Sequence, residues 1–384
     1  MEGSLVPPDW PPLTFDEVET LLSRFPALGE PARILTVSPR PFSAAGVVAT
    51  PSGPVFVKRH HRAVRDREGL LEEHRFLAHL FARGASVPRV IADTSGETAI
   101  EIGDSVYEVH ETPPGIDLYE EAISWTPFRS AAHAYSAGQA LARLHLAAQD
   151  FAAPARKPRP LVASFTIFAA RDPIQAMANY LGRCASLSGH KGARVCAARA
   201  IELLSSFRGE LAPLLPALEL LWTHNDLHAS NLFWSGEADN AHATAVIDFG
   251  LADRTNAVHD LAHAIERNIV EWLTLVQDAN QPPAVHLDHL AALLDGYESV
   301  RPLSAEESAA LAPMTALCHA EFALSEADYF LGVLHSEERA AMAYDGWLVG
   351  HARWFASAAG RELLDALRRR AKARARRVYA VTMQ

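Results

Sequence analysis

The 384-residue sequence predicts an α+β protein of two lobes, in which a small antiparallel sheet precedes a larger, mostly helical lobe. Short β-branched segments dominate the first part of the chain, and Ala- and Leu-rich helical periodicity dominates from about residue 130 onward. The length also exceeds that of one typical domain, which is about 100–200 residues. We place the boundary at a Pro-Pro-Gly break and predict lobes at residues 1–112 and 113–384.

The small lobe is expected to hold an amphipathic helix, a β-hairpin, a longer helix and further strands. A Thr or Asp cap begins the first helix, and a Pro-Ser-Gly turn joins the two hairpin strands. Apolar residues recur at helical spacing in the longer helix, and Gly84 marks its end. The expected elements are helix 14–25, strands 32–40, 47–50 and 55–58, helix 65–83, and strands 87–93, 97–103 and 105–112.

The large lobe is predicted to be helical apart from one island. A helix is expected at 131–149, and long helices without an internal repeat at 259–377. Between them lie two short apolar segments, 220–234 and 243–254, joined by a loop of Ser, Gly, Asp and Asn. We interpret these two segments as a hairpin embedded among helices.

Composition excludes several classes of protein. The net charge of −11, from 46 acidic and 35 basic residues, argues against a nucleic-acid partner, because such binding depends on neutralising phosphates. Three cysteines are too few and too scattered for a disulfide framework or a zinc site. The N-terminus lacks a secretory pattern and no apolar run of about 18 residues occurs, so we expect a cytoplasmic protein with no membrane partner.

The island carries the residues on which chemistry is expected. Asp226 follows His224, Asn231 follows five residues later, and Asp248 lies in the string Val-Ile-Asp-Phe-Gly. A carboxylate that accepts the proton of an attacking hydroxyl, with two oxygen ligands for Mg²⁺, is what phosphoryl transfer from a metal nucleotide requires. Taken singly, each of these residues is more typical of an ordinary turn. Together they form a strong signal.

The strings HNDLHASNLFW and AVIDFGLADR resemble the catalytic and metal loops of the aminoglycoside phosphotransferase and choline kinase superfamily, which has the protein-kinase-like fold. Two neighbouring segments resemble the same superfamily. One places Asp260 at the position of a structural aspartate, and the other ends the preceding helix at His145. The resemblance covers residues 35 to 270 in order and implies an ATP-dependent, Mg²⁺-assisted phosphotransferase.

The resemblance also implies a division of labour. Asp226 would deprotonate the acceptor hydroxyl, Asn231 and Asp248 would hold Mg²⁺, and Lys58 would neutralise the α- and β-phosphates. Lysine occurs only four times in the sequence, which singles out Lys58 on its predicted strand. An acidic residue of helix 65–83 should pair with Lys58. The family spacing favours Glu73, while Glu68 and Glu72 remain alternatives, because periodicity alone does not choose among them.

The nucleotide is expected between the lobes. The segment RPFSAAGVVAT, with Ser43 and Ala44, takes the place of the phosphate loop, although it has a single glycine. By resemblance, backbone groups of His110, Glu111 and Thr112 would contact the adenine. The expected cofactors are therefore ATP and Mg²⁺.

The acceptor is expected to be a small and possibly amine-bearing molecule. Glu321 and Asp328 share one face of a predicted helix with Ser325, and Glu326 lies off that face. An acidic stripe of this kind suits an amine, although such stripes are more often simply solvated. An aromatic cage for a quaternary ammonium group is an alternative, and at helical spacing the same aromatics are more typical of a core. These are Trp272, Tyr329, Tyr344, Trp347 and Trp354.

Two other functions use the same fold. One is a nucleotide-binding regulatory protein, and the other is a protein kinase acting on Ser or Thr. All the polar catalytic positions are filled, which favours an active enzyme over a regulatory protein. The basic segment 368–377 is best interpreted as a solvated terminal helix.

Overall fold

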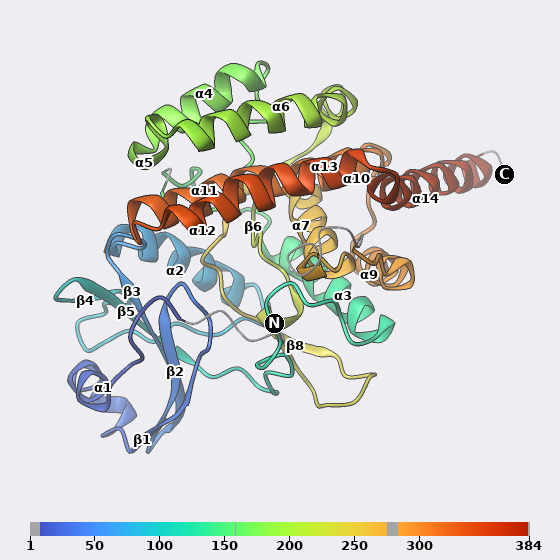
Figure 1. Ribbon diagram of the computed structural model, residues 1–384. Coiled ribbons are helices and arrows are strands. Elements are labelled where there is room, and N and C mark those ends of the chain that lie inside the picture. Colours follow the sequence, from blue (N-terminus) through green and yellow to red (C-terminus); the bar gives the residue numbers. More distant parts are fainter. Residues whose placement is uncertain (1–7, 158, 275–282, 383–384) are drawn as a thin grey trace.

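The computed structural model describes residues 8–157, 159–274 and 283–382 and has two lobes (Figure 1). The small lobe is built on a five-stranded antiparallel sheet with the order β1-β2-β3-β5-β4. Its elements are α1 (Phe15–Leu22), η1 (Pro26–Leu28), β1 (Arg33–Val37), β2 (Ala44–Thr50), β3 (Gly53–His61), α2 (Arg67–Ala82), β4 (Ile100–Ile102) and β5 (Ser105–Glu111).

The predicted elements of this lobe are present with one exception. Segment 87–93 does not form a strand of its own and makes only an isolated bridge between Val90 and His110. Pro88 lacks the N–H that a ladder needs, so the prediction of a full strand there was wrong. Strand β5 ends at Glu111, one residue before the expected lobe boundary.

Helix α2 begins and ends as its sequence predicts. The carboxylate of Asp66 accepts a hydrogen bond of 2.7 Å from the N–H of Gly69, which caps the helix N-terminus. At the other end Gly84 has φ +78°, a conformation that favours glycine. Phe76, Leu77 and Leu80 of α2 belong to the core of the large lobe, so this helix packs across the boundary between the lobes.

The large lobe is mostly helical, with two small sheets near the lobe boundary. Its elements are α3 (Ala131–Ala147), α4 (Pro173–Arg183), α5 (Ala185–Ser188), α6 (Lys191–Leu211), η2 (Leu215–Ala217), β6 (Leu220–Thr223), η3 (Ala229–Asn231), β7 (Leu232–Trp234), β8 (Ala243–Val246), β9 (Asp253–Asn256), α7 (Ala257–Ile269), α9 (Leu287–Val300), α10 (Ala305–Leu317), α11 (His319–Gly332), α12 (Glu337–Ala341), the π-helix η4 (Met342–Val349), α13 (Gly350–Ala356) and α14 (Ala358–Thr382).

The sequence island forms two nested antiparallel pairs rather than one hairpin. Strand β7 pairs with β8, and β6 pairs with β9 around them. The loops that join these strands carry the Asp and Asn residues singled out above. Nesting therefore brings the loop after β6 and the loop after β8 to the same place.

The N-terminal segment crosses from the small lobe onto the large one. The carboxylate of Asp9 accepts a hydrogen bond of 2.9 Å from the Tyr329 hydroxyl and forms an ion pair with Arg339. The ring of Trp10 stacks on His61 of β3, with centroids 4.7 Å apart. The segment therefore ties the sheet to α11 and α12.

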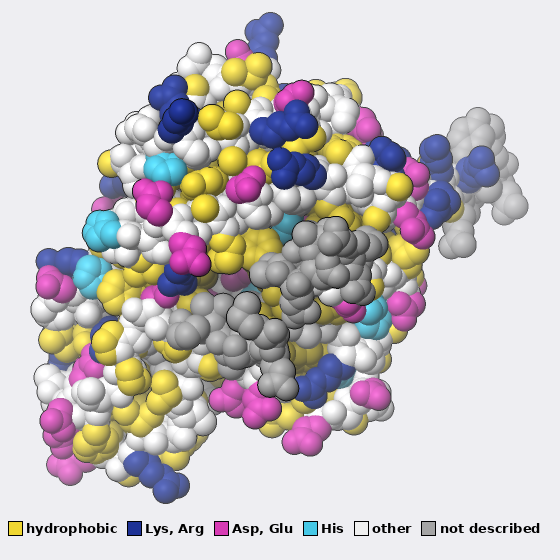
Figure 2. Space-filling view, in the orientation of Figure 1, with side chains coloured by type: hydrophobic (Ala, Val, Ile, Leu, Met, Phe, Trp, Pro, Cys, Tyr) yellow, Lys and Arg dark blue, Asp and Glu magenta, His cyan; other side chains and the backbone are white. Residues whose placement is uncertain are grey.

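Three basic side chains of the C-terminal helix, those of Arg368, Arg370 and Arg374, pair with acidic neighbours. Arg368 bonds Glu210 of α6 at 2.8 Å, and Arg370 bonds Asp295 of α9 at 2.7 Å. Among the atoms coloured by type in Figure 2, basic and acidic side chains are interspersed. Within the described ranges, every helix is too short or too polar to cross a lipid bilayer.

Candidate active site

The loop after β6 is anchored by a buried carboxylate at the start of α7. Asp260 accepts hydrogen bonds from the N–H groups of His224 and Asn225, at 2.9 and 2.7 Å, and from the His145 ring, at 3.0 Å. Burial raises the pKa of Asp260, but these bonds and the nearby histidines outweigh it, so the pKa lies below its usual value. Asp260 and His145 thus have the structural contacts that the family resemblance implies.

Each of the two loops contains a non-glycine residue with positive φ. Asn225 has φ +61° and Asp248 has φ +59°, which only a few per cent of non-glycine residues adopt. The Asn225 side chain is fully buried, and its oxygen accepts hydrogen bonds from Thr223 and Thr255 at 2.8 and 3.1 Å. Asn225 therefore braces the loop from behind.

Asp226 lies between an amide and a guanidinium. The amide nitrogen of Asn231 donates to the backbone oxygen of Asp226 at 2.9 Å and to its carboxylate at 3.3 Å. On its other side, the same carboxylate forms an ion pair with Arg267 of α7. Asp226 is thus held on two sides by its neighbours.

Asn231 and Asp248 are brought together by the β7–β8 pair. The N–H of Ile247 donates to the backbone oxygen of Asn231 at 3.0 Å, which sets Asn231 beside the residue that precedes Asp248. The amide nitrogen of Asn231 is engaged by Asp226, so its oxygen is the atom that suits a cation. A carboxylate with an amide oxygen is the kind of ligand set that Mg²⁺ prefers.

Lys58 reaches across the boundary between the lobes to Asp248. Its ammonium lies 3.1 Å from the carboxylate oxygen of Asp248. Burial raises the pKa of Asp248, but the charge and hydrogen bond of Lys58 outweigh it and hold that pKa well below its usual range. Asp248 is therefore ionised at neutral pH and available to a cation.

The structure corrects the expected ion pair between Lys58 and Glu73. The Glu73 carboxylate contacts two arginines instead of Lys58, with Arg65 Nε at 2.7 Å and an Arg156 nitrogen at 2.7 Å. The guanidinium of Arg156 also donates to the backbone oxygen of Gly69 at 2.7 Å. Two nearby guanidiniums outcompete one ammonium that already has Asp248 as its partner.

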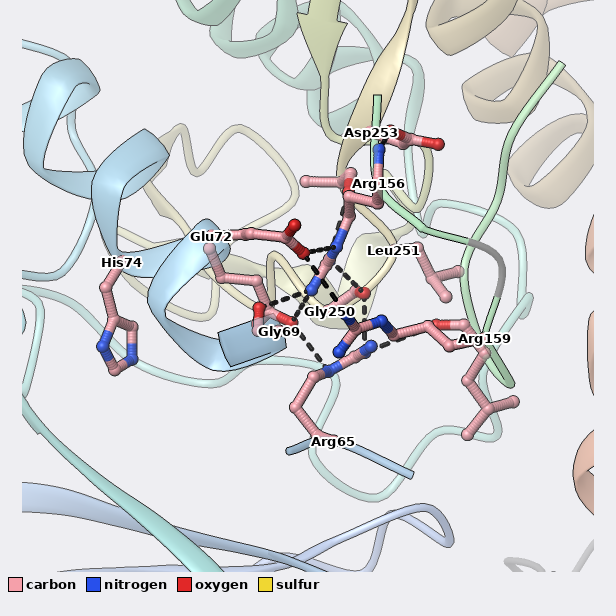
Figure 3. Close-up of polar contacts among 12 residues, drawn as sticks. Arg65, Gly69, Glu72, His74, Arg156, Arg159, Gly250, Leu251 and Asp253 are labelled. Carbon is pink, nitrogen blue, oxygen red and sulfur yellow. Dashed lines mark hydrogen bonds and ion pairs between the residues drawn. The ribbon is translucent and has the colours of Figure 1, made fainter. Parts of the chain in front are cut away.

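The alternatives Glu72 and Glu68 do not contact Lys58 either. Glu72 lies 3.4 Å from Arg156, and Glu68 forms an exposed pair with Lys157 at 3.1 Å. Arg156 further donates to the backbone oxygens of Gly250 and Ala252, at 3.2 and 3.1 Å. It therefore joins α2 to the segment that follows Asp248 (Figure 3).

The expected phosphate loop is shorter than its sequence suggests. Ser43 precedes β2 and is buried, while Ala44 already pairs with Arg59 of β3, so the β1–β2 connection spans residues 38–43. A Cβ on Gly46 would lie 2.4 Å from the backbone oxygen of Thr36. Close strand packing, rather than a phosphate contact, accounts for this glycine.

Arg40 is a residue of this connection that sequence reasoning missed. Its guanidinium donates to the backbone oxygens of Ala122 and Tyr119 at 2.8 and 3.1 Å, so it spans the two lobes. Burial lowers its pKa, and the charges of Asp117 and Asp248 oppose that effect. The only signal in the sequence is a basic residue held between two prolines.

The expected adenine contacts fall at the end of β5. His110 pairs with Phe56 of β3, and the N–H of Glu111 already donates to the backbone oxygen of Arg89 at 2.9 Å. That N–H is not free to bind a nucleotide, so the predicted adenine contact through the N–H of Glu111 was wrong. Thr112 lies beyond the strand and stays a prediction.

The acidic face proposed for the acceptor has other partners. The Glu321 carboxylate accepts a hydrogen bond of 3.0 Å from the Thr166 hydroxyl, and backbone N–H groups of residues 166–167 also donate to it. Asp328 accepts from the Ser186 hydroxyl of α5. Both carboxylates hold chain segments in place, so the helical period was right and the inferred role was wrong.

Aromatic side chains surround Arg267, the ion-pair partner of Asp226. The guanidinium of Arg267 lies 4.8 Å from the centre of the Phe322 ring and 5.6 Å from that of Trp125. Arg267 is 1% exposed, and burial lowers its pKa to about 10, although nearby Glu326 acts in the opposite direction. Trp125 has φ +71°, an outlier for a bulky residue.

Arg267 lies on a helix that has no solvated face. Every residue of α7 is buried, including the charged ones, so the charged residues of the string HDLAHAIERN have no solvated face. The aromatic alternative is mostly core, because Trp272, Tyr329 and Trp354 are all buried. Only Trp347 reaches this region, with its ring 5.5 Å from that of Trp125.

Comparisons with known proteins show what this chain is similar to. The profile of the family described as "Phosphotransferase enzyme family" matches residues 45–303. A homoserine kinase of Methylobacterium radiotolerans is 28% identical over 276 residues, which is 68% of this chain and 70% of that protein.

Two solved structures are similar in fold. A microcompartment-associated aminopropanol kinase has a TM-score of 0.59 and 18% identity, and the match covers 92% of this chain and 98% of that one. An amicoumacin kinase in complex with AMP-PNP, Ca²⁺ and Ami has a TM-score of 0.54 and 13% identity, with 87% of this chain and 93% of that one covered. The two-lobed fold is thus that of small-molecule kinases.

Proposed function

This chain belongs to the phosphotransferase enzyme family and is an ATP-dependent kinase of a small hydroxyl-bearing molecule, and we propose that its acceptor carries both a carboxylate and an amine. The observation that carries the proposal is the buried guanidinium of Arg267 beside Asp226. A buried cation next to the catalytic base suits an acceptor that brings its own anion.

In the proposed reaction, the residues of the chain position charge rather than form covalent bonds. Asp226 orients the acceptor hydroxyl and takes its proton, and Lys58 neutralises the phosphates of ATP. Asn231 and Asp248 would hold Mg²⁺, which supplies charge neutralisation on the phosphates when bound. Arg40, which spans the two lobes, is a further cation on which the charge of Asp248 acts.

The acceptor's carboxylate would replace Asp226 as the partner of Arg267. That exchange keeps the buried guanidinium paired and leaves the Asp226 carboxylate for the hydroxyl. The guanidinium of Arg267 packs against the rings of Trp125 and Phe322. Because these rings position its planar group, the exchange of one carboxylate partner for another needs no large movement of Arg267.

Glu326 would bind the ammonium group of the proposed acceptor. Burial raises its pKa to about 7, and the charges of Arg267 and Arg339 oppose that shift. An ammonium group brought beside it by the acceptor would favour the ionised carboxylate. A zwitterion with a terminal hydroxyl thus matches a site that offers one buried cation, one buried carboxylate and one base. Homoserine, which the related kinase's name specifies, has this chemistry.

Three matched acceptors test the proposal. Homoserine has both charged groups, 3-aminopropan-1-ol lacks the carboxylate, and 4-hydroxybutanoate lacks the amine, while all three keep a primary hydroxyl. Phosphate transfer from Mg-ATP is measured for each by mass spectrometry of the product. We expect homoserine to be the best acceptor. Tight Mg-ATP binding without transfer to any acceptor would instead favour the regulatory alternative.

A variant of Arg267 shows which group it recognises. Arg267→Gln should lower kcat/KM for homoserine by about 10- to 150-fold, the equivalent of about 1.5–3 kcal/mol for a charge-assisted contact. Its effect on 3-aminopropan-1-ol should be much smaller. Arg368→Gln, which removes a partly exposed guanidinium paired with Glu210 at 2.8 Å, is the control. An equal loss with both acceptors would mean that Arg267 serves only Asp226.

A further inference from the structure

We propose that the small lobe carries a binding site for a divalent transition-metal ion, formed by His74 of α2 with Glu108 and His110 of β5. The three residues come from two elements that pack face to face. One ligand atom from each, two imidazole nitrogens and a carboxylate oxygen, lies within 4.8 Å of the others. This site shares no residue with the loops that carry Asn231 and Asp248, although Glu108 lies opposite Lys58 in the register of β3 and β5.

The distances are those of a site already assembled. Oε2 of Glu108 lies 2.9 Å from Nε2 of His74 and 2.7 Å from Nε2 of His110. A tetrahedral zinc ion with bonds of about 2.0–2.1 Å separates its ligand atoms by about 3.3 Å. The two distances between imidazole and carboxylate therefore need to lengthen by only about half an ångström, and rotation about the terminal bonds supplies that.

Further residues orient the ligands as metal sites require. The second oxygen of Glu108 is bonded to His60 Nε2 at 2.9 Å, and Nδ1 of His74 lies 2.8 Å from the Thr98 hydroxyl. Metal-binding imidazoles donate their other N–H to a neighbouring oxygen, and metal-binding carboxylates are themselves hydrogen-bonded. Thr98 and His60 occupy these two supporting positions.

Burial argues against an accidental surface cluster. His74, Glu108 and His110 are 5%, 4% and 7% exposed. Three imidazoles around one carboxylate also form a satisfied hydrogen-bond network, which is the competing interpretation. In that network each Nε2 carries its proton toward Glu108. Nδ1 of His110 is buried and has no hydrogen-bond partner in the described part of the chain, so this nitrogen does not distinguish the two interpretations, and ion binding itself has to be measured.

The donor set selects the class of ion. Mg²⁺ and Ca²⁺ favour oxygen ligands, whereas imidazole nitrogens favour zinc, cobalt, nickel and copper. Two imidazoles with one carboxylate leave the fourth tetrahedral position for water or for a small movement of His60. The proposal therefore names a first-row divalent ion of the zinc type.

Cobalt titration tests the proposal on the full chain. The protein is treated with a chelator, dialysed, and titrated with Co²⁺ in the presence of excess Mg²⁺, which occupies the oxygen sites. We expect about one Co²⁺ per chain, with the intense visible absorption of four-coordinate cobalt. His74→Gln and His110→Gln should each weaken binding about 100-fold or more, because ligands matter at least as much as the residues that support them.

Two matched variants distinguish this site from cobalt binding elsewhere on the chain. His79→Gln, on the same helix, removes a ring that bonds the backbone oxygen of Ala147 and should leave the cobalt signal unchanged. Asp248→Asn should also leave it unchanged, although it impairs the catalytic site. Loss of the signal in Asp248→Asn alone, equal binding by all variants, or no stoichiometric binding would each overturn the proposal.

Thermal melting shows whether each variant is folded and whether Zn²⁺ binds to it. Zn²⁺ should raise the melting temperature of the unaltered chain and of His79→Gln, because a ligand that binds only the folded state stabilises it. It should not raise that of His74→Gln or His110→Gln. An identical Zn²⁺ shift in all four proteins would place the ion elsewhere. None of these readouts uses phosphate transfer, so failure of the metal site and failure of the proposed function are distinguishable.

Discussion

The substitution Glu73→Gln separates a structural role for this carboxylate from a catalytic one. Glu73 is 4% exposed and lies 2.7 Å from Arg65 and 2.7 Å from Arg156. Removing one partner of a buried ion pair costs about 3–5 kcal/mol, because the remaining charges stay buried without compensation. Glutamine keeps the shape and one acceptor oxygen, so we expect a loss at the lower end, about 3 kcal/mol.

Urea denaturation measures this loss, and Glu68→Gln is the control. Glu68 and Lys157 are 62% and 69% exposed, so their pair contributes at most about 1 kcal/mol. The affinity of folded Glu73→Gln for Mg-ATP should match that of the unaltered chain, because Lys58 keeps Asp248 as its partner. A variant that is as stable as the control but binds Mg-ATP weakly would refute this reasoning and restore the pair with Lys58.

Three further predictions concern the catalytic loop and acid stability. Asp226→Ala should abolish phosphate transfer while leaving Mg-ATP binding largely intact, as calorimetry can check; full turnover would remove Asp226 as the base. Asp260→Asn should lower the free energy of unfolding by about 2–4 kcal/mol, measured in urea. The new side-chain NH₂ group would face N–H groups that now donate to the carboxylate, so buried donors would be left without an acceptor. Burial lowers the pKa of His228, His259 and His351 to about 3, so the unfolded chain binds more protons than the folded one below about pH 6.5. Stability should therefore fall as the pH drops from 6.5 toward 3. Buried glutamates with pKa values raised to about 7 oppose this between pH 7 and about 4.5, so unfolding curves should show the steepest loss below pH 4.5.

Local sequence predicted the catalytic loops because their geometry is local. Asp226 and Asn231 share one loop, and a short strand pair brings Asp248 beside them, so spacing alone fixes their proximity. The partner of Glu73 is not local. Arg156 lies 83 positions further along the chain, in a segment without helical or strand periodicity, so no pattern links the two residues.

The acceptor side shows a different limit of sequence reasoning. Helical periodicity correctly placed Glu321 and Asp328 on one face, but it does not say which face meets the catalytic loop. The structure turns that face toward Thr166 and Ser186, and Glu326, which lies off the face, is the carboxylate of this helix whose charge acts on Arg267. Face selection is a matter of tertiary packing, and the sequence of one helix does not contain it.

Both reactive carboxylates of the site are neutralised by a cation that, under the proposed function, also recognises a ligand. Asp248 is paired with Lys58, and Asp226 is paired with Arg267. The phosphates of ATP compete for Lys58, and the carboxylate of the acceptor competes for Arg267. Each ligand would thus release the carboxylate that its own step requires, Asp248 for the metal ion and Asp226 for the hydroxyl. Buried charge stays balanced before and after binding, which is the condition that a low-dielectric site imposes.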